Sequence, residues 1–537
     1  MTRFNRPSAR PPVRGPVETT GERILTHEGA PAYARTAKSD LVLMALGSFY
    51  GQATLYEESK VRESRFSKLV RTVALEDPAW LAAFVTWLRS EANMRTAALV
   101  AAGEQAHGMI EPGVPGARKV ISSALLRADE PGEFLAYWTA NYGRKLPMAV
   151  KRGVGDAALR LYNERSLLKY DTNSHGFRFG DVLELTHPGD TKGAAQHLAF
   201  PAQGDLFRHA IDRRHGREGN LPESLPVLRA NTDLRKMAKD EPAILLSPSA
   251  LKAAGMTWED ALSLGGQHGL DKRRLWEAMI PSMGYMALLR NLRNFDDAGI
   301  PDSVAQRVMS RLADLAEVER SRQLPFRFFS AYRQLNTLRW GHALEIATSL
   351  SCVNVPGLEG TSLVCVDLSG SMDRTVSDRS QISYKEVGAL FAAVLAERGE
   401  AVTVVPYGTT YRNLGILRPG SVLRNTEKIL ACDVGYGTRT YEAVSRNYAQ
   451  QSKVFVFTDE QSWGGAYHSG FGVRRGDLTT AVPVHIPLFA FNLAGHAPSS
   501  LDLSQPNRFA LGGFTDKLFT LVKVLLEGRG ALWPWEE

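Results

Sequence analysis

Three alternate polar side chains follow an apolar stretch in the second half of the chain. Residues 364–366 are apolar, and Asp367, Ser369 and Ser371 come next, with one residue between each pair. If the apolar stretch is a strand that ends at the carboxyl edge of a parallel sheet, these side chains point into one crevice. Hydroxyl and carboxylate oxygens are hard ligands that suit a Mg²⁺-like ion with waters in its shell. The alternative is an ordinary strand-to-loop turn rich in serine and glycine.

Two later stretches carry residues of the same kind. Residues 435–440 form a glycine-containing loop that presents Thr438 and Thr440 in front of a helical pattern. Residues 454–457 are a second apolar run, closely followed by Asp459. Thr438 is the preferred candidate because it follows a glycine directly, and Thr440 remains its competitor.

These three stretches, in this order, resemble the metal-ion-dependent adhesion site of von Willebrand factor A domains. The resemblance implies that Ser369, Ser371 and Thr438 ligate one Mg²⁺ ion and that Asp367 and Asp459 support it by holding its waters. Zn²⁺ is not expected here, because the site offers neither histidine nor cysteine.

The elements around these residues alternate between strands and helices. The expected strands are 363–366, 402–406, 453–457 and 484–491, and the expected helices are 383–398, 441–448 and 516–526. This alternation predicts a doubly wound α/β domain over residues 361–537, in which a site lies at the carboxyl ends of the strands. Residues 351–360 are the expected linker in front of it.

The chain before the linker has a helical pattern over residues 33–350. Residues 77–88 combine an N-cap aspartate, a proline and a broad apolar face, and residues 129–138 repeat the theme. This recurrence favours irregular HEAT-like helical repeats, and chance recurrence of a common cap is the alternative. Residues 1–32 begin with arginines among prolines, which predicts a flexible basic tail.

Composition restricts the class of protein. With 44% hydrophobic and 23% charged residues the chain is an ordinary folded protein. It contains no apolar run of the roughly 18 residues that a membrane span needs. Its three cysteines lack metal-type spacing, which favours a reducing, cytoplasmic setting. After residue 360 the number of lysines and arginines equals the number of aspartates and glutamates. The net charge of +7 therefore comes from the first 360 residues, where we expect a polyanion to bind.

Several stretches of the helical part resemble the Ro autoantigen family, in which a TROVE module precedes a von Willebrand factor A domain. They are residues 146–164, 181–188, 283–294 and the stretch from Pro325 onward. The resemblance implies a ring of helical repeats followed by the α/β domain. It also implies binding of small noncoding Y RNA on an outer basic surface, and of single-stranded 3′ ends of misfolded RNA in a central hole. Short loops and many arginines suggest a bacterial member, and bacterial members are associated with exoribonucleases.

The basic residues of the helical part support an RNA partner. Between residues 141 and 180, eight basic residues accompany three acidic ones. The candidate contacts are Lys151, Arg152, Arg160, Lys169 and His187 on the outer surface, and Arg290 and Arg293 in the hole. Residues 208–217 hold a second basic cluster. The alternative is that these side chains are solvated helix faces, or, for the last pair of arginines, salt-bridged surface residues.

No catalytic set of residues emerges from the spacing of nucleophiles, bases or glycine-rich loops. The sequence therefore predicts a monomeric, noncatalytic RNA-binding protein that acts in RNA quality control or processing. The alternative function is a Mg²⁺-dependent protein-ligand module on a helical scaffold.

Overall fold

The computed structural model describes residues 13–536 apart from 48, 111, 175, 190–201, 218, 379, 464–466, 470, 471 and 475. The chain forms two compact units. One unit combines the described residues up to Val73 with Val318–Gln334 and with the chain from Gly341 onward. The other unit holds Ala74–Glu317 and Leu335–Trp340. Among the described helices, none joins enough length to enough apolar character to pass through a bilayer.

The second unit is helical. Its helices are α3 (Pro78–Ser90), α4 (Arg95–Ile110), α5 (Ala117–Ala124), α6 (Glu130–Tyr142), α7 (Met148–Leu161), α8 (Glu164–Tyr170), α9 (Phe179–Thr186), α10 (Gln203–Arg214), α11 (Pro226–Asp240), α12 (Pro248–Ala253), α13 (Trp258–Gln267), α14 (Lys272–Met279), α15 (Tyr285–Asp297) and α16 (Asp302–Leu312). The Asp77 side chain caps α3 by accepting the Trp80 N–H at 3.0 Å, as predicted. Asp129 does not cap α6, because its carboxylate bonds to Arg127 and Arg95 instead.

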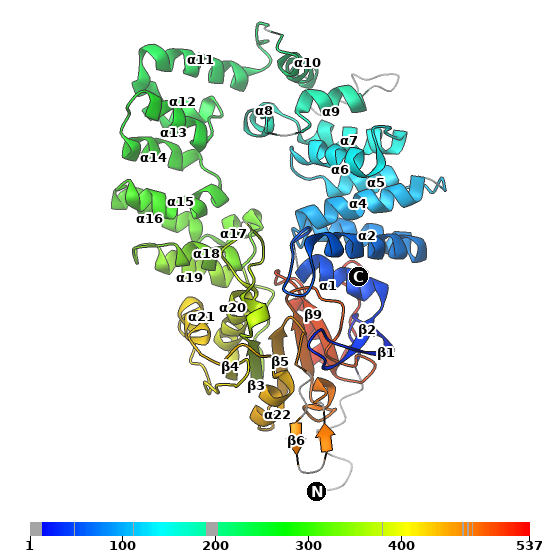
Figure 1. Cartoon of the computed structure of the whole chain (residues 1–537). Helices are drawn as coiled ribbons and strands as arrows, with labels where there is room; N and C mark the ends of the chain where they lie inside the picture. Colours follow the sequence, from blue (N-terminus) through cyan, green and yellow to red (C-terminus); the bar gives the residue numbers. More distant parts are fainter. Residues whose placement is uncertain are drawn as a thin grey trace. The chain divides into compact units, whose positions relative to one another are not determined.

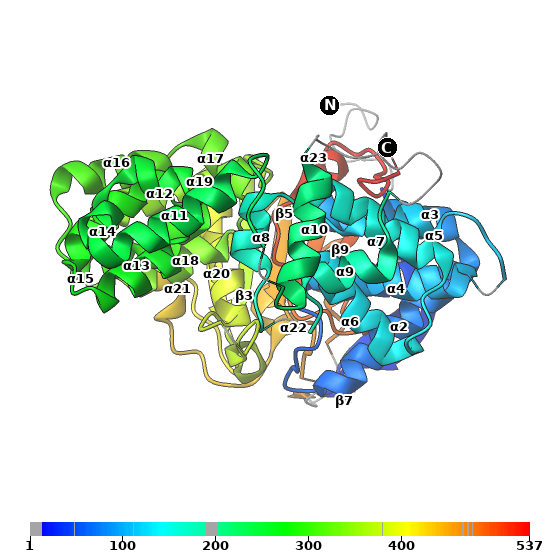
Figure 2. The same cartoon turned by 90° about the horizontal axis from the view of Figure 1, so that it is seen from above.

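Glycines allow the helices of this unit to pack closely. A Cβ atom at Gly153 of α7 would lie 2.8 Å from the Arg118 carbonyl and 2.9 Å from Ile121 of α5. A Cβ atom at Gly180 of α9 would lie 2.5 Å from Arg214 of α10. Helices α4, α5, α7 and α9 accordingly follow one another side by side (Figure 2).

The first unit contains the strands. Its elements are β1 (Thr19–Leu25), β2 (Pro31–Arg35), α1 (Ala37–Gly47), α18 (Phe326–Arg333), α19 (Gly341–Leu350), β3 (Leu358–Asp367), α20 (Tyr384–Arg398), β4 (Gly399–Tyr407), α21 (Val422–Leu430), α22 (Thr440–Asn447), β5 (Lys453–Thr458), β6 (Tyr467–Ser469), β7 (Gly472–Arg474), β8 (Leu488–Asn492), β9 (Arg508–Gly512) and α23 (Phe519–Leu526). Helices α2 (Ser59–Glu76) and α17 (Leu315–Ser321) each begin in one unit and end in the other.

The main sheet has five parallel strands in the order β4-β3-β5-β8-β9 (Figure 1). The chain places β4 on one side of β3 and then returns to place β5 on the other side. Because crossover connections are right-handed, this reversal puts the connecting helices on opposite faces of the sheet. The predicted fold class, a helical part followed by a doubly wound α/β domain, is confirmed in these elements. The closed ring that the resemblance implies stays a prediction.

The start of the chain differs from the predicted tail over 1–32. Residues 1–12 lie outside the described part, but β1 and β2 pair as an antiparallel hairpin. The Tyr33 N–H donates to the Ser499 carbonyl at 2.9 Å, and Val13 and Val17 are buried. These contacts join residues more than 400 positions apart, and local sequence pattern carries no signal of such contacts.

Other boundaries also differ from those expected. Strand β3 begins at Leu358, inside the expected linker 351–360, and β8 begins at Leu488 instead of residue 484. Strand β9 was not predicted. Helices α1, α18 and α19 belong to the compact unit of the sheet, although the helical pattern continues through them.

Candidate metal centre and nucleic-acid surface

The sheet brings the two predicted aspartates to one edge. Asp367 is the last residue of β3, and Asp459 follows β5 directly. These strands are neighbours, with Val366 opposite Phe457. They also flank the point at which the strand order reverses, where open α/β sheets hold their ligands. The parallel sheet therefore brings the two aspartates to the edge at which the sequence predicts a crevice.

Hydrogen bonds hold the first of these segments in a compact turn. Asp367 is fully buried, and its carboxylate accepts the Ser369 N–H at 2.9 Å and the Thr458 hydroxyl at 2.8 Å. The Ser369 and Ser371 hydroxyl oxygens lie 3.2 Å apart. The two serines thus present adjacent oxygens beside a buried carboxylate, which is the arrangement expected from their alternate spacing.

The threonine loop is tied to the same crevice through its backbone. The Thr438 carbonyl accepts the Trp463 N–H, and the Tyr436 carbonyl accepts the Gly370 N–H, both at 2.9 Å. The competitor Thr440 is committed elsewhere, because its hydroxyl donates to Tyr407 at 3.2 Å and accepts from Ser462 at 2.8 Å. The structure therefore favours Thr438 over Thr440 as a free hydroxyl ligand.

The electrostatics of the crevice suit a divalent cation. Burial raises the pKa of Asp367, and burial together with the neighbouring charge of Asp367 raises the pKa of Asp459. A cation beside these carboxylates would favour their charged forms and so offset the burial that raises both pKa values. Among the described residues, no group of three or more His, Cys, Asp or Glu side chains could hold a metal ion. The donors are thus two carboxylates and several hydroxyls, which fits Mg²⁺ better than Zn²⁺.

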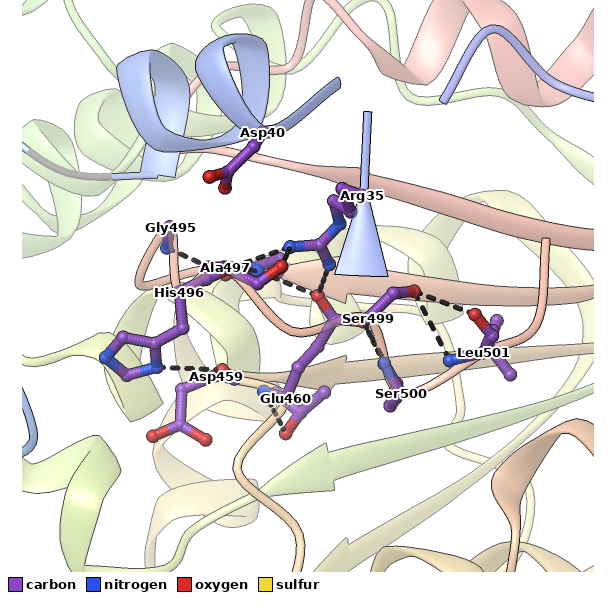
Figure 3. A network of polar contacts seen from close by, with 12 residues as sticks. Arg35, Asp40, Asp459, Glu460, Gly495, His496, Ala497, Ser499, Ser500 and Leu501 are labelled. Carbon is purple, nitrogen blue, oxygen red and sulfur yellow. Dashed lines mark hydrogen bonds and ion pairs between the residues drawn. The ribbon is translucent and has the colours of Figure 1, made fainter. Parts of the chain in front are cut away.

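A buried polar network anchors the loop that carries Asp459 (Figure 3). Glu460, fully buried, pairs with Arg35 of β2 and accepts both the N–H and the hydroxyl of Ser500 at 3.0 Å. Arg35 also donates to the carbonyls of His496, at 2.7 Å, and Ala497, at 3.0 Å. The network joins β2 to the loop that carries Asp459, which we call the ion-site loop.

His496 adds a second anchor to the same loop. Its Nδ1 atom lies 3.0 Å from the Asp459 carbonyl, and its Nε2 atom lies 3.0 Å from the Thr54 hydroxyl. A carbonyl can only accept, so Nδ1 carries the proton and Nε2 accepts from Thr54. Burial lowers the pKa of His496 well below its usual value, which keeps the ring neutral.

A second candidate site lies on the helical unit. Lys151 and Arg152 of α7 and His187 at the end of α9 line one cavity of about 620 Å³. Arg152 and His187 are exposed, and Lys151 is half-buried. Arg118 and Asp156 also line the cavity and form an ion pair at 2.6 Å. Three of the five predicted outer-surface residues therefore meet in one place; we call this cavity the cationic cavity.

Arg160 and Lys169, the other two, have different surroundings. The Arg160 guanidinium donates to the carbonyls of Ser122, at 2.9 Å, and Leu125, at 2.7 Å, so it satisfies the C-terminal end of α5. Lys169 is exposed and lies 5.1 Å above the ring centre of Tyr170. Neither residue lines the cationic cavity.

The remaining basic candidates are helix-surface residues. Arg290 and Arg293 of α15 are exposed, and Arg293 pairs with Asp297 one turn later at 3.7 Å. The second basic cluster is also paired: its ion pairs are Arg208–Asp205, Arg213–Asp171, Arg214–Asp181, His215–Glu184 and Arg217–Asp212. Arg293 therefore fits the alternative of a salt-bridged surface residue, and the basic side chains of the cluster have acidic neighbours.

Comparison with known proteins finds similarity to one family. A family model for the TROVE domain matches residues 250–400. The crystal structure of the Ro (Rsr) protein of Deinococcus radiodurans is similar over 92% of this chain and 100% of that chain, with a TM-score of 0.59 and 18% sequence identity. Telomerase protein component 1 from Mus musculus and from Rattus norvegicus is 39% identical over 84 residues. Over residues 250–400 the chain is similar to the TROVE (Ro) family.

Each match covers only part of a chain or is low in identity, which limits what it says about this protein. The match to either telomerase component spans 15% of this chain and 3% of that protein. At 18% identity the Ro structure shows a shared fold alone. The TROVE match over residues 250–400 includes Ser369 and Ser371 but not Lys151, Arg152 or His187.

Sequence reasoning missed the residues that anchor the loop carrying Asp459 in this chain. Glu460 is one residue beyond a predicted ligand, and a second acid after an apolar strand is the signal that could have singled it out. Arg35 and His496 had no such signal, because their partners lie far away in the chain.

Proposed function

We propose that this protein is a noncatalytic RNA-binding protein that binds a small structured noncoding RNA, of the Y RNA kind, at the cationic cavity. The observation that supports the proposal is the meeting of Lys151, Arg152 and His187, which come from two helices, around one hollow of about 620 Å³. Cations on rigid helices hold phosphates in a fixed register, and a histidine at their edge suits a base edge or a 2′-hydroxyl.

The cavity is built for binding and not for hydrolysis. Its carboxylate, Asp156, is paired with Arg118 at 2.6 Å and is therefore not available as a general base. Lys151 and Arg152 present cationic side chains to the cavity, and Arg152 is exposed while Lys151 is half-buried. Positively charged, accessible side chains of this kind act through phosphate contacts.

The proposal extends to the family's other expected features. The crevice residues Ser369, Ser371 and Thr438, with Asp367 and Asp459 behind them, would hold one Mg²⁺ ion, which would neutralise the buried carboxylates. Binding of single-stranded RNA 3′ ends, an exoribonuclease partner and a cytoplasmic role in RNA quality control are proposed from the similarity to the TROVE family.

A charge-removal experiment tests the RNA surface. Replacing Lys151 and Arg152 by alanine should weaken binding to every RNA in similar proportion. The slope of log K against log salt should become shallower by about 0.7 to 0.9 per lost phosphate contact. Fluorescence anisotropy across a salt series with a labelled hairpin RNA, with and without a single-stranded 3′ tail, measures both quantities.

The matched control removes one exposed lysine from another helix of the same unit. Lys239 lies in the last turn of α11 and is exposed. If Lys239→Ala weakens RNA binding as much as the loss of Lys151 and Arg152, the proposed surface is wrong. If the tailed and untailed hairpins bind equally, the 3′-end part of the proposal is wrong.

A further inference from the structure

Exposed aromatic side chains gather at the carboxyl edge of the main sheet. Among the described phenylalanines, tyrosines and tryptophans, only Tyr411, Tyr436 and Trp463 are exposed, with exposed fractions of 43%, 82% and 43%. Tyr411 comes four residues after the end of β4, and Trp463 comes five residues after the end of β5. Two of the three rings therefore follow strands that lie on either side of β3.

Tyr436 supplies the ring over β3 itself. A Cβ atom at Gly370, in the turn after β3, would lie 3.5 Å from the Tyr436 ring. The Gly370 N–H also donates to the Tyr436 carbonyl at 2.9 Å. The ring thus rests on the backbone of this turn while most of its surface faces water, and the three rings follow the strand order β4-β3-β5.

Hydrogen bonds connect the segments that carry the rings. The Gly437 N–H donates to the Thr409 hydroxyl at 2.7 Å, which joins the loop of Tyr436 to the turn of Tyr411. The Trp463 N–H donates to the Thr438 carbonyl at 2.9 Å, which joins the same loop to the segment after β5. The three rings therefore belong to one connected surface, which we call the aromatic rim.

The aromatic rim is accompanied by positive charge. Residues 408–439 contain five lysines and arginines and two acidic residues, although the chain after residue 360 is balanced as a whole. Arg412, next to Tyr411, is exposed. The Arg439 guanidinium lies 5.2 Å from the ring centre of Trp463, in a cation–π contact, and pairs with Glu442 at 3.5 Å.

Flat exposed rings beside cations suit an unpaired stretch of nucleic acid. Every base has a π face that can stack on an aromatic ring, and the phosphates between bases are attracted to cations. A duplex offers the phosphates but keeps its base faces inside its own stack. Tyrosine, tryptophan and arginine also occur at protein interfaces, so a protein partner is the alternative that the experiment must separate. The local excess of positive charge favours the polyanion.

We propose that the aromatic rim binds unpaired nucleotides of RNA, with bases stacked on its rings and phosphates near Arg412 and Arg439. The inference rests on the RNA-binding function proposed above and adds to it a second RNA site, in the compact unit that contains the sheet. Because every base can stack on a ring, the rim should accept single strands of any sequence.

Removing one ring tests the stacking. Tyr436→Ala should weaken binding of a labelled oligouridine by about 5- to 150-fold, the factor that corresponds to one lost stack between a base and an aromatic ring. Tyr436→Phe keeps the flat ring and should bind like the unaltered protein. Tyr436→Leu keeps only apolar bulk and should bind as weakly as the alanine variant. Fluorescence anisotropy at fixed Mg²⁺ and salt measures the affinity, and the melting temperature should stay unchanged because the side chain is exposed.

Photocrosslinking locates the bound strand directly. An oligouridine that carries 5-iodouridine should crosslink, on irradiation, to peptides that contain Tyr411, Tyr436 or Trp463. Val353→Ala is the matched control, because Val353 is an exposed apolar residue that precedes β3 and so lies toward the amino end of that strand. This control should change neither the affinity nor the crosslinked peptides.

The outcomes separate the aromatic rim from the cationic cavity. A blunt RNA duplex should bind Tyr436→Ala as well as the unaltered protein, and removal of Lys151 and Arg152 should weaken it. If the loss of Lys151 and Arg152 leaves duplex affinity unchanged, the cavity proposal is wrong, and the oligouridine measurements still decide the rim.

The rim proposal fails on its own if the double variant Tyr411→Ala, Tyr436→Ala binds oligouridine like the unaltered protein. The exposed rings would then be left to a protein partner. Full affinity in Tyr436→Leu would also overturn the proposal, because stacking would not be involved. Crosslinks confined to peptides of the helical unit would place the single strand elsewhere and would have the same consequence.

Discussion

At the scale of single residues, location in the fold separates side chains that look alike in the sequence. Arg152 and Arg160 lie on the same helix, α7, and both are exposed. Arg152 lines the cationic cavity, whereas the Arg160 guanidinium is occupied by carbonyls of α5. Only the first is available to a phosphate, so charge alone is a poor guide to RNA contacts.

His187 allows a clean test of a directional contact with RNA. It is exposed and ends α9 with a left-handed φ of 47°, a conformation that asparagine also tolerates. His187→Asn should therefore leave the melting temperature near that of the unaltered protein. It should weaken binding to the structured RNA by roughly 1 to 3 kcal/mol, the scale of a good base contact.

The measurement compares a structured RNA with a nonspecific single strand. An unchanged affinity for the structured RNA would show that His187 makes no contact, and unfolding of the variant would show that the residue is structural. His187→Ser, which lacks the preference of asparagine for a left-handed backbone, is the companion variant.

His496 should make the stability of the protein depend on pH. Its pKa is lowered in the folded protein, so below its ordinary value of about 6.5 the unfolded chain binds a proton that the folded chain does not. Stability from this group is thus complete above about pH 6.5 and is lost as the pH falls below it. Urea unfolding between pH 7.5 and about 5.5 measures the slope, which one proton limits to about 1.4 kcal/mol per pH unit.

The control is His496→Gln, which keeps a donor and an acceptor but cannot be protonated. This variant should lose part of the slope. An identical slope in both proteins would show that other groups cause the pH dependence.

At the scale of elements, the hairpin β1–β2 is a structural partner of the loop after β5. Arg35 ends β2 and forms a fully buried ion pair with Glu460, next to Asp459. The hairpin thereby connects the first described strands with the candidate metal centre. This connection explains why the start of the chain forms one compact unit with the sheet.

Removing one partner of this ion pair should lower the free energy of unfolding. Arg35→Met leaves the buried Glu460 carboxylate without its cation, which destabilises a protein by about 3 to 5 kcal/mol. Mn²⁺ affinity should fall as well, because the loop that holds Asp459 loses its anchor. Urea unfolding and Mn²⁺ titration measure the two effects.

The double variant Arg35→Met, Glu460→Gln provides the contrast. It removes the buried charge as well as its partner, so it should recover part of the lost stability. If Arg35→Met alone is neutral, the network does not anchor the loop.

At the scale of the whole molecule, the two candidate sites belong to different compact units. The ligands Ser369, Ser371 and Thr438 lie in the unit with the sheet, and Lys151, Arg152 and His187 lie in the helical unit. Each site is complete within its own unit. Metal binding and RNA binding are therefore expected to be separable by mutation.

Ser371→Ala tests this separation. The substitution removes one predicted hydroxyl ligand and should weaken Mn²⁺ or Mg²⁺ binding measured by titration, while the salt-sensitive affinity for a hairpin RNA stays the same. A loss of RNA affinity in Ser371→Ala, or on chelation of metal in the unaltered protein, would contradict the separation and would connect the ion to the RNA site.

What the sequence determined by itself was local. The Asp77 cap of α3, the helix from Tyr384 to Arg398 and the apolar strands β3 and β5 each leave a pattern within a few residues. The ion-site candidates were also visible, because each one lies at or near the end of a strand or directly after a glycine. The order of strands and helices then indicated the fold class.

Only the tertiary structure decided which distant residues meet. The docking of the hairpin of residues 19–35 beside Ser499, the anchor between Arg35 and Glu460 and the contact of Tyr56 with His496 all join segments more than 400 residues apart. The structure also distinguished Arg152 from Arg160, since the neighbouring helix occupies one guanidinium and not the other. The physical reason is that such contacts are set by packing of whole elements, and the sequence around any one residue does not record its neighbours in space.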